Sequence, residues 1–271
     1  MFHSLLRPLA VVCCLFLAAC AGHAGKEASP EMATVQAKMG YFTVISVATQ
    51  PETGLVLPAL LYKNQDVSPI TDPMRSLSAS PEVQDFPLPG CESVTVEMFT
   101  GGANCCFGYY LLTSCPDGSS AAYIEPRNGG LDNAQHALRA YPLDDPTFFY
   151  YEPKSQKSVN KLSLSRVESP RITRFLVFEN NAWRADKPGE LPAAYTSLLA
   201  QTRKDKDVNR TAKAISMTYY TLMIGGNDAA AARVLKRSLP GTYAPLASVI
   251  LADIKAAVAE FDPVRNLDIS K

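Results

Sequence analysis

The hydrophobic period of the chain changes near residue 190, and this change limits the folds that the chain can adopt. Between residues 41 and 185, short β-branched and aromatic runs alternate with Pro, Gly, Asn and Asp, as in strands joined by turns. After residue 190, apolar residues recur at three- and four-residue steps, as on one face of a helix. We therefore predict an α+β chain: a mostly antiparallel β domain (a sheet or a sandwich), then a bundle of about four helices.

The strand-like runs end in a pair that flanks Asn180-Asn181, a turn signal that predicts a hairpin. The expected strands are 41–49, 55–62, 93–99, 107–113, 121–125, 147–152, 159–167, 172–179 and 182–186. One segment with helical character, 133–141, interrupts them.

The helical part carries its own start and stop signals. The expected helices are 193–201, 212–223, 229–239 and 246–261. Gly225-Gly226 ends the second helix, and Asn227 or Asp228 can cap the third. Pro240-Gly241 separates the third helix from the last.

Composition predicts a packed core, and charge disfavours nucleic acid as a partner. Of 271 residues, 47% are hydrophobic, which is enough for such a core. The chain has 26 basic and 26 acidic residues, so we expect no nucleic-acid partner, because no excess of positive charge is available to attract phosphates. The one dense charge run, 203–207, mixes signs and is typical of a solvated helix end.

The N-terminus has the pattern of an exported lipoprotein. Arg7 precedes an unbroken apolar run, Leu9–Ala19, which suits a signal peptide and is shorter than the roughly 20 residues of a membrane-spanning helix. The run ends in Leu17-Ala18-Ala19-Cys20, which resembles the lipobox of bacterial lipoproteins. The alternative is ordinary cleavage beside the small residues Ala19 and Ala21, with Cys20 discarded.

The lipobox resemblance implies that Cys20 becomes the N-terminus and carries a diacylglyceryl thioether and a third acyl chain. Two chains already anchor a protein stably, so three hold it on a bilayer. Assuming a diderm source, Ala21 in place of an aspartate favours the periplasmic face of the outer membrane. The predicted segments are a signal peptide 1–19, a lipidated cysteine and flexible tether 20–40, a β-rich domain 41–188, a helical domain 189–262 and a tail 263–271.

Four cysteines remain after this processing, and an oxidising compartment favours disulfides among them. Three connectivities are possible. Strand-like runs on both sides of a glycine-containing loop predict a hairpin, and an odd loop centred on Ala103 would place Cys91 opposite Cys115. We therefore predict a Cys91–Cys115 bond, with Cys105 and Cys106 bridged to each other or left as thiols.

The stretch 101–106, GGANCC, resembles a Gly-Gly-Ala-His-Cys-Cys motif that follows a strand in a set of exported bacterial proteins of unknown function. Asn104 stands where histidine is common, which removes a local Cys-Cys-His site for a metal or for proton transfer. We expect Gly101, Gly102, Ala103 and Asn104 to form a rigid hairpin tip that contacts a partner, because rigid loops lose less entropy on binding.

These observations indicate a non-catalytic binding or assembly module of the cell envelope, without a cofactor or a metal, attached to the membrane through its lipid. The expected partner is an envelope protein or a glycan. Aromatic pairs such as Tyr150-Tyr151 can stack on sugars, although sheet packing is the commoner role of such pairs.

Two alternatives involve the adjacent cysteines. A thiol-dependent enzyme or redox protein would use Cys105 and Cys106 with His136, a residue of the expected helix 133–141. A zinc site would use the same three residues, but their spacing matches no standard ligand pattern. We assign no catalytic residue from the sequence.

Overall fold

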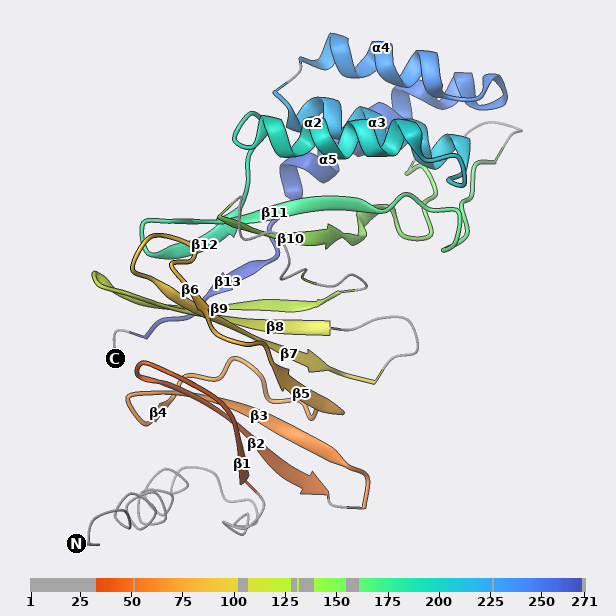
Figure 1. The fold of residues 1–271 in the computed structure, drawn as a ribbon. Helices are drawn as coiled ribbons and strands as arrows, with labels where there is room; N and C mark the ends of the chain where they lie inside the picture. Colours follow the sequence, from red (N-terminus) through yellow and green to blue (C-terminus); the bar gives the residue numbers. More distant parts are fainter. Residues whose placement is uncertain are drawn as a thin grey trace, which may run out of the picture. The chain divides into compact units, whose positions relative to one another are not determined.

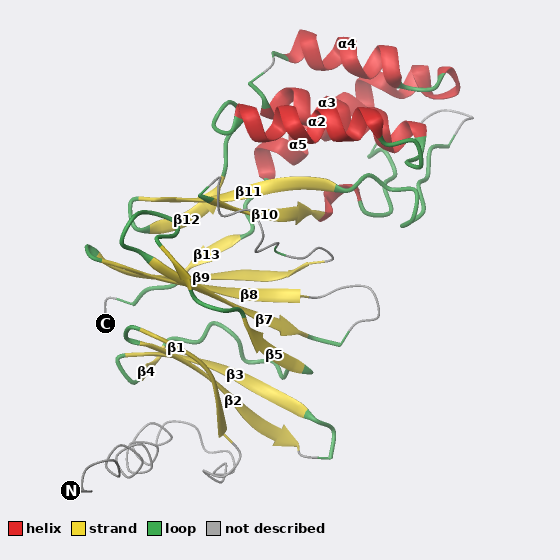
Figure 2. Ribbon diagram, in the orientation of Figure 1, coloured by secondary structure: helices red, strands yellow, loops and turns green. Residues whose placement is uncertain are grey.

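The structure is a computed structural model that describes residues 33–50, 52–101, 107–127, 131, 139–154, 161–225 and 227–269. In these residues, antiparallel strands precede four α-helices, which confirms the predicted α+β class (Figures 1 and 2). The chain forms two compact units. The first contains the residues up to Pro126 and those from Arg265 onward, and the second is Arg127–Val264.

The first unit is a sandwich of two sheets. The four-stranded sheet has the order β1 (Ala33–Met39), β2 (Phe42–Gln50), β3 (Leu55–Tyr62), β4 (Gln65–Asp66). The second sheet has the order β13 (Val264–Asn266), β9 (Gly118–Arg127), β8 (Phe107–Cys115), β7 (Glu92–Phe99), β5 (Ser76–Ala79), and β6 (Val83–Gln84) also pairs with β7.

Alternating side chains explain why these two sheets pack face to face. Val94 and Val96 of β7 are at most 4% exposed, and they belong to one hydrophobic cluster with Phe42, Val44 and Leu60 of the other sheet. Successive side chains of a strand point to opposite faces, so one face of each sheet supplies this core. Of the two predicted arrangements, the structure has the sandwich.

The β7–β8 hairpin has the predicted register. Its pairs run from Glu92↔Ser114 to Phe99↔Phe107, and each pair is centred on residue 103. Cys91 and Cys115 therefore follow directly at the open end of the ladder, and they form a disulfide bond, as predicted. The bond closes a loop with a sequence separation of 24.

Removing this bond should destabilise the first unit. We expect the double variant Cys91→Ala, Cys115→Ala to lose about 3 kcal/mol of unfolding free energy, because the unfolded chain regains the entropy of a loop of this length. Urea unfolding followed by tyrosine near-UV circular dichroism measures the loss, and reductant should lower the wild-type midpoint but leave the double variant unchanged. An unchanged midpoint in the double variant would contradict the role that we give the bond.

The second unit contains a three-stranded sheet and the four helices. Strands β10 (Ala140–Asp145), β11 (Ile172–Glu179) and β12 (Ala182–Ala185) are antiparallel neighbours in that order. The helices are α2 (Pro192–Lys204), α3 (Arg210–Met223), α4 (Asp228–Ser238) and α5 (Ala247–Glu260), with a 3-10 turn, η4 (Gly241–Leu246), before α5.

Local signals place several of these elements. Asn180 and Asn181 have φ angles of 52° and 58°, as a tight two-residue hairpin turn requires, so the predicted β11–β12 hairpin is confirmed. Asn209 caps α3, since its side chain accepts the Thr211 N–H at 2.8 Å. Of the two predicted caps for α4, the structure uses Asn227.

The boundary between the units differs from the predicted one at residues 188 and 189. The units divide at Pro126 and Arg127, because β10–β12 belong with the helices. Ile172 and Phe175 of β11, both at most 1% exposed, lie in the same hydrophobic cluster as Ile215 of α3. The change of period near residue 190 therefore marks a change of element type inside one unit.

Two predicted strands are wrong. Residues 147 and 148 belong to a 3-10 turn, residues 149 and 150 form a turn, and residues 151 and 152 have no regular structure, because Asp145 and Pro146 start a helical turn there. The described part of 159–167, from residue 161, contains no strand. Apolar and polar residues alternate in this segment because Leu162 and Leu164 are buried in the core, and not because the segment pairs with another strand. Residues 133–138 of the predicted helix lie outside the described residues, whereas Ala140 belongs to β10.

Candidate functional site

Of the predicted site residues, the structure describes the two that form the disulfide, Cys91 and Cys115, and Gly101. The predicted site residues outside the described residues are Cys20, Gly102, Ala103, Asn104, Cys105, Cys106 and His136. The hairpin tip, the lipidation site and the alternative thiol or zinc site thus stay predictions. Within the described ranges, no group of three or more His, Cys, Asp or Glu side chains could hold a metal ion.

Gly101 marks the start of the predicted tip. Its φ is +100°, in the region that favours glycine, and a Cβ at this position would overlap the Arg75 side chain. The Arg75 N–H donates to the Phe99 carbonyl at 2.7 Å, which holds Arg75 beside the end of β7. The positive φ and the close approach of the Arg75 side chain therefore both favour glycine at this position.

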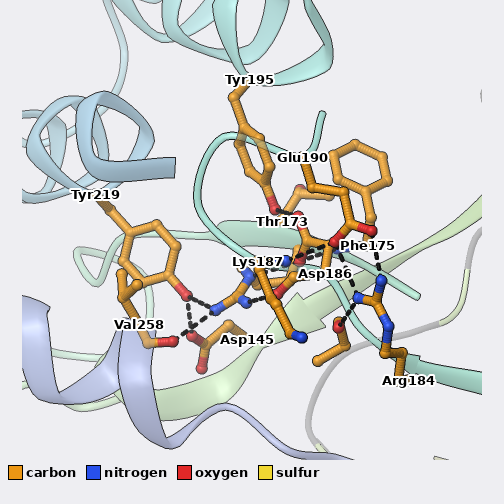
Figure 3. Close-up of polar contacts among 12 residues, drawn as sticks. Asp145, Thr173, Phe175, Arg184, Asp186, Lys187, Glu190, Tyr195, Tyr219 and Val258 are labelled. Carbon is orange, nitrogen blue, oxygen red and sulfur yellow. Dashed lines mark hydrogen bonds and ion pairs between the residues drawn. The ribbon is translucent and has the colours of Figure 1, made fainter. Parts of the chain in front are cut away.

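The most extensive buried polar network among the described residues surrounds Arg174 of β11 in the second unit. Figure 3 labels its partners Asp186, Tyr219 and Val258. Arg174 Nε lies 2.9 Å from Asp186 Oδ1, and Nη2 donates to the Asp186 carbonyl at 2.7 Å. Both side chains are at most 1% exposed. Nη1 donates to the Tyr219 hydroxyl at 2.9 Å and to the Val258 carbonyl at 3.4 Å.

Two tyrosines complete this network. Tyr195 of α2 donates its hydroxyl hydrogen to Asp186 Oδ2 at 2.6 Å, and Tyr219 of α3 donates to Asp145 Oδ2 at 2.7 Å. Burial raises the pKa of both hydroxyls, and the carboxylate beside each hydroxyl raises it further. Both tyrosines therefore stay protonated and act as donors.

The network is structural in its geometry. Arg174, Asp186, Tyr195, Tyr219 and Asp145 direct their polar atoms at one another, and none of them lines the cavity described below. A buried ion pair needs such partners, because desolvating each ion costs several kcal/mol. The network around Arg174 connects the three-stranded sheet to α2, α3 and α5.

A cavity of about 230 Å³ lies beside the segment that follows β10. It is lined by Thr147, Phe148, Tyr150, Tyr151, Glu152, Lys154 and Asp253. We call it the Tyr150 cavity. Its lining combines aromatic rings, two carboxyl groups and one ammonium group, which are groups that can bind a small polar molecule.

The backbone turns the two adjacent tyrosines of this cavity in different directions. Asp145 accepts the Thr147 N–H at 2.9 Å and starts the 3-10 turn η3 (Pro146–Phe148). Tyr150 follows with a φ of 56°, which is uncommon for a bulky residue, and it is 61% exposed. Tyr151 is only 5% exposed. An exposed ring held by an unfavourable backbone conformation is a reasonable sign of a functional position.

Asp253 of α5 forms the buried wall of the cavity and is 9% exposed. Its Oδ2 accepts the Tyr151 hydroxyl at 2.8 Å and the Lys154 N–H at 3.2 Å. Burial raises the pKa of Tyr151, and the hydrogen bond to Asp253 raises it further, so this hydroxyl remains a donor. The two donors fix the carboxylate in place.

The sequence contained partial signals for these groups. The Tyr150-Tyr151 pair was identified as a possible stacking surface, but Asp253 was missed. Asp253 is the one acidic residue between Asp228 and Glu260 and stands in the apolar run 246–254, and a carboxylate in such a run is a usable signal. Arg174 was likewise missed, although it stands inside the apolar run of β11.

One helical stretch in the described residues, Gly241–Glu260, is long and apolar enough to cross a membrane by length and composition. Its α5 part contributes Ile250, Ile254 and Ala257 to the core of the second unit. The same stretch contains Asp253, whose carboxylate is hydrogen-bonded. One face of α5 therefore packs against the core of the second unit.

Comparison with known proteins gives no relative: no family model, no curated protein and no solved structure matches this chain. The function must therefore be inferred from the chemistry of the chain itself. Two features carry that chemistry in the described residues, the buried network and the Tyr150 cavity.

Breaking the buried pair should destabilise the second unit strongly. We expect Asp186→Asn to cost about 3–5 kcal/mol, because Arg174 would keep its charge without a counter-ion. Unfolding in urea, followed by the fluorescence of Trp183, reports on this unit, since Trp183 is the single tryptophan of the chain and is buried in β12.

Arg184→Gln is the matched control. Arg184 forms ion pairs with Glu179 and Glu190, but its side chain is 26% exposed. Exposed pairs contribute about 1 kcal/mol or less each, so the control should lose much less stability. Equal losses in the two variants would show that burial does not decide the strength of these pairs.

Proposed function

We propose that the chain is a lipid-anchored, non-catalytic binding module of the bacterial cell envelope, held through Cys20 at the periplasmic face of the outer membrane. The Cys91–Cys115 bond supports an exported location, because disulfides form and persist in oxidising compartments. The apolar run Leu9–Ala19 and the lipobox that ends it support the anchor.

The Tyr150 cavity is the binding site of this proposal, and a saccharide is its ligand. The exposed Tyr150 ring offers a flat apolar face for a sugar ring. Asp253 and Glu152 can accept hydrogen bonds from hydroxyl groups, and Lys154 can donate to them. A volume of about 230 Å³ lies below the range of drug-sized pockets, which suits one sugar of a longer glycan.

The arrangement of the cavity supports binding because its groups are held before a ligand arrives. The hydrogen bonds from Tyr151 and the Lys154 backbone N–H hold Asp253 in place, and η3 and the left-handed backbone of Tyr150 set the direction in which the Tyr150 side chain leaves the chain. Groups already held in place lose little entropy on binding. The described residues that line the cavity contain no cysteine or histidine, which favours binding over thiol chemistry at this position.

The anchor is tested at Cys20. We expect Cys20→Ser to prevent lipidation, so that the protein remains unprocessed or becomes soluble, whereas the wild type fractionates with the outer membrane. The intact mass of the N-terminal peptide should show the acyl chains on the wild-type protein. An unmodified N-terminus at Gly22 would overturn the lipoprotein proposal.

The ligand is tested at Tyr150. We expect Tyr150→Ala to weaken binding of a β-1,4-linked N-acetylglucosamine oligomer about 10-fold in calorimetric titration, because the stacking face is lost. Tyr41→Ala is the matched control, since Tyr41 of the first unit is 65% exposed and Tyr150 is 61% exposed. Failure of the wild type to bind the oligomer, or equal loss in both variants, would contradict the saccharide site.

A further inference from the structure

One end of the helical bundle is strongly basic, although the whole chain has no net charge. We call this surface the basic end. It consists of Arg203, Lys204, Lys206, Arg210, Lys213, Arg233, Lys236 and Arg237. Only Asp205 and Asp207 oppose them in the connection between α2 and α3, and no acidic residue occurs between Asp228 and Asp253.

The helix connections bring these residues together. Residues 205–209 join α2 to α3, and residues 224–227 join α3 to α4, so consecutive helices are antiparallel neighbours (Figure 1). The C-terminus of α2, the N-terminus of α3 and the C-terminus of α4 therefore lie at the same end of the bundle. Two hydrogen bonds show that the start of α3 lies beside the end of α2. Lys213 Nζ of α3 donates to the Arg203 carbonyl at 2.8 Å and to the Asp205 carbonyl at 2.6 Å.

Within the part of the chain that the structure describes, seven of these eight side chains are exposed and have no counter-ion. The eighth, Lys213, is partly buried and likewise takes part in no ion pair with another described residue. At the opposite end of α4, in contrast, Asp228 pairs with Lys255 at 2.5 Å.

Helix dipoles explain only part of the cluster. Basic residues in the last turns of α2 and α4 interact favourably with the free carbonyls there. Arg210, however, is the first residue of α3, where positive charge is unfavourable, and the first turn of α3 contains no acidic residue. Arg233 and Arg237 stand four residues apart on one face of α4, where like charges repel. Helix stability therefore does not account for this surplus of charge.

We propose that the basic end binds the anionic phosphate headgroups of a phospholipid bilayer. Clusters of four to eight Lys and Arg residues beside a membrane-spanning helix or on an amphipathic helix are a sign of anionic lipid binding, and the basic end brings eight such residues together from α2, α3, α4 and the α2–α3 connection. The inference goes beyond saccharide binding, and it rests on the proposed function only in the choice of a bilayer as the source of phosphate. A nucleic acid is disfavoured, because the disulfide indicates export and the chain as a whole has no net charge.

The test uses the processed chain from residue 21 to 271 without its lipid, so it is independent of lipidation at Cys20. Co-sedimentation is measured with vesicles of phosphatidylcholine alone and with vesicles that contain about one third phosphatidylglycerol, at about 0.05 M and 0.5 M NaCl. We expect binding to the anionic vesicles at low salt only. The triple variant Arg233→Gln, Lys236→Gln, Arg237→Gln should bind on the order of 100-fold more weakly, since each basic residue near the surface contributes about 5-fold.

The matched control removes three exposed positive charges elsewhere, with Lys38→Gln, Lys161→Gln and Arg171→Gln. Arg171 lies away from the basic end, because its carbonyl accepts from Tyr220 in the last turn of α3. The control should bind like the wild type, and Trp183 fluorescence should show that both triple variants are folded. Equal binding to neutral vesicles, equal loss in the control, or no loss in the α4 variant would overturn the proposal.

Two further arms identify the source of phosphate. Millimolar inorganic phosphate should displace the protein from the anionic vesicles no more than chloride does at equal ionic strength. Stronger displacement by phosphate would show that the basic end binds free phosphate. Tighter binding to a short DNA duplex than to the anionic vesicles would assign it to nucleic acid. Neither arm involves Tyr150 or Cys20, so failure of this inference is distinguishable from failure of the proposed function.

Discussion

The second unit depends on one buried guanidinium. Arg174 connects β11 to Asp186 after β12, to Tyr219 of α3 and to the Val258 carbonyl of α5. Its Cζ atom also lies 4.5 Å from the centre of the Phe261 ring. Because a buried charge is tolerated only with its donors satisfied, all of these elements must be in place together. We infer that the network favours this arrangement of sheet and helices over looser packings of the same apolar surfaces.

The sequence predicted the elements whose signals are local. The Asn180-Asn181 turn, the Asn227 cap and the centre of the β7–β8 hairpin each depend on residues within one turn or one ladder. The domain boundary was not predictable in this way. It depends on Arg174 contacting residues 45 and 84 positions away, at Tyr219 and Val258, and on apolar contacts between β11 and the helices. No periodicity carries that information.

The candidate site shows the same limit. The pair Tyr150-Tyr151 was visible as an aromatic surface, but a sequence pattern treats its two members alike. Their different environments come from the left-handed backbone of Tyr150 and from Asp253, which is 102 positions away from the tyrosine that it holds. The same reasoning explains the wrong strand at 147–152, where Asp145 and Pro146 impose a helical turn on residues with high strand propensity.

Charge balance over the whole chain hides a separation of charge that the fold creates. The antiparallel helices gather eight basic side chains at one end, and such a surface attracts anions only over about 8 Å at physiological salt. At physiological salt such contacts alone would hold a soluble protein only weakly on a bilayer, whereas the proposed lipid on Cys20 would supply stable attachment. Tethering makes a second contact intramolecular, so a weak interaction becomes effective at high local concentration. In this arrangement the basic end would orient the helical unit toward the headgroups, and the lipid would provide the attachment.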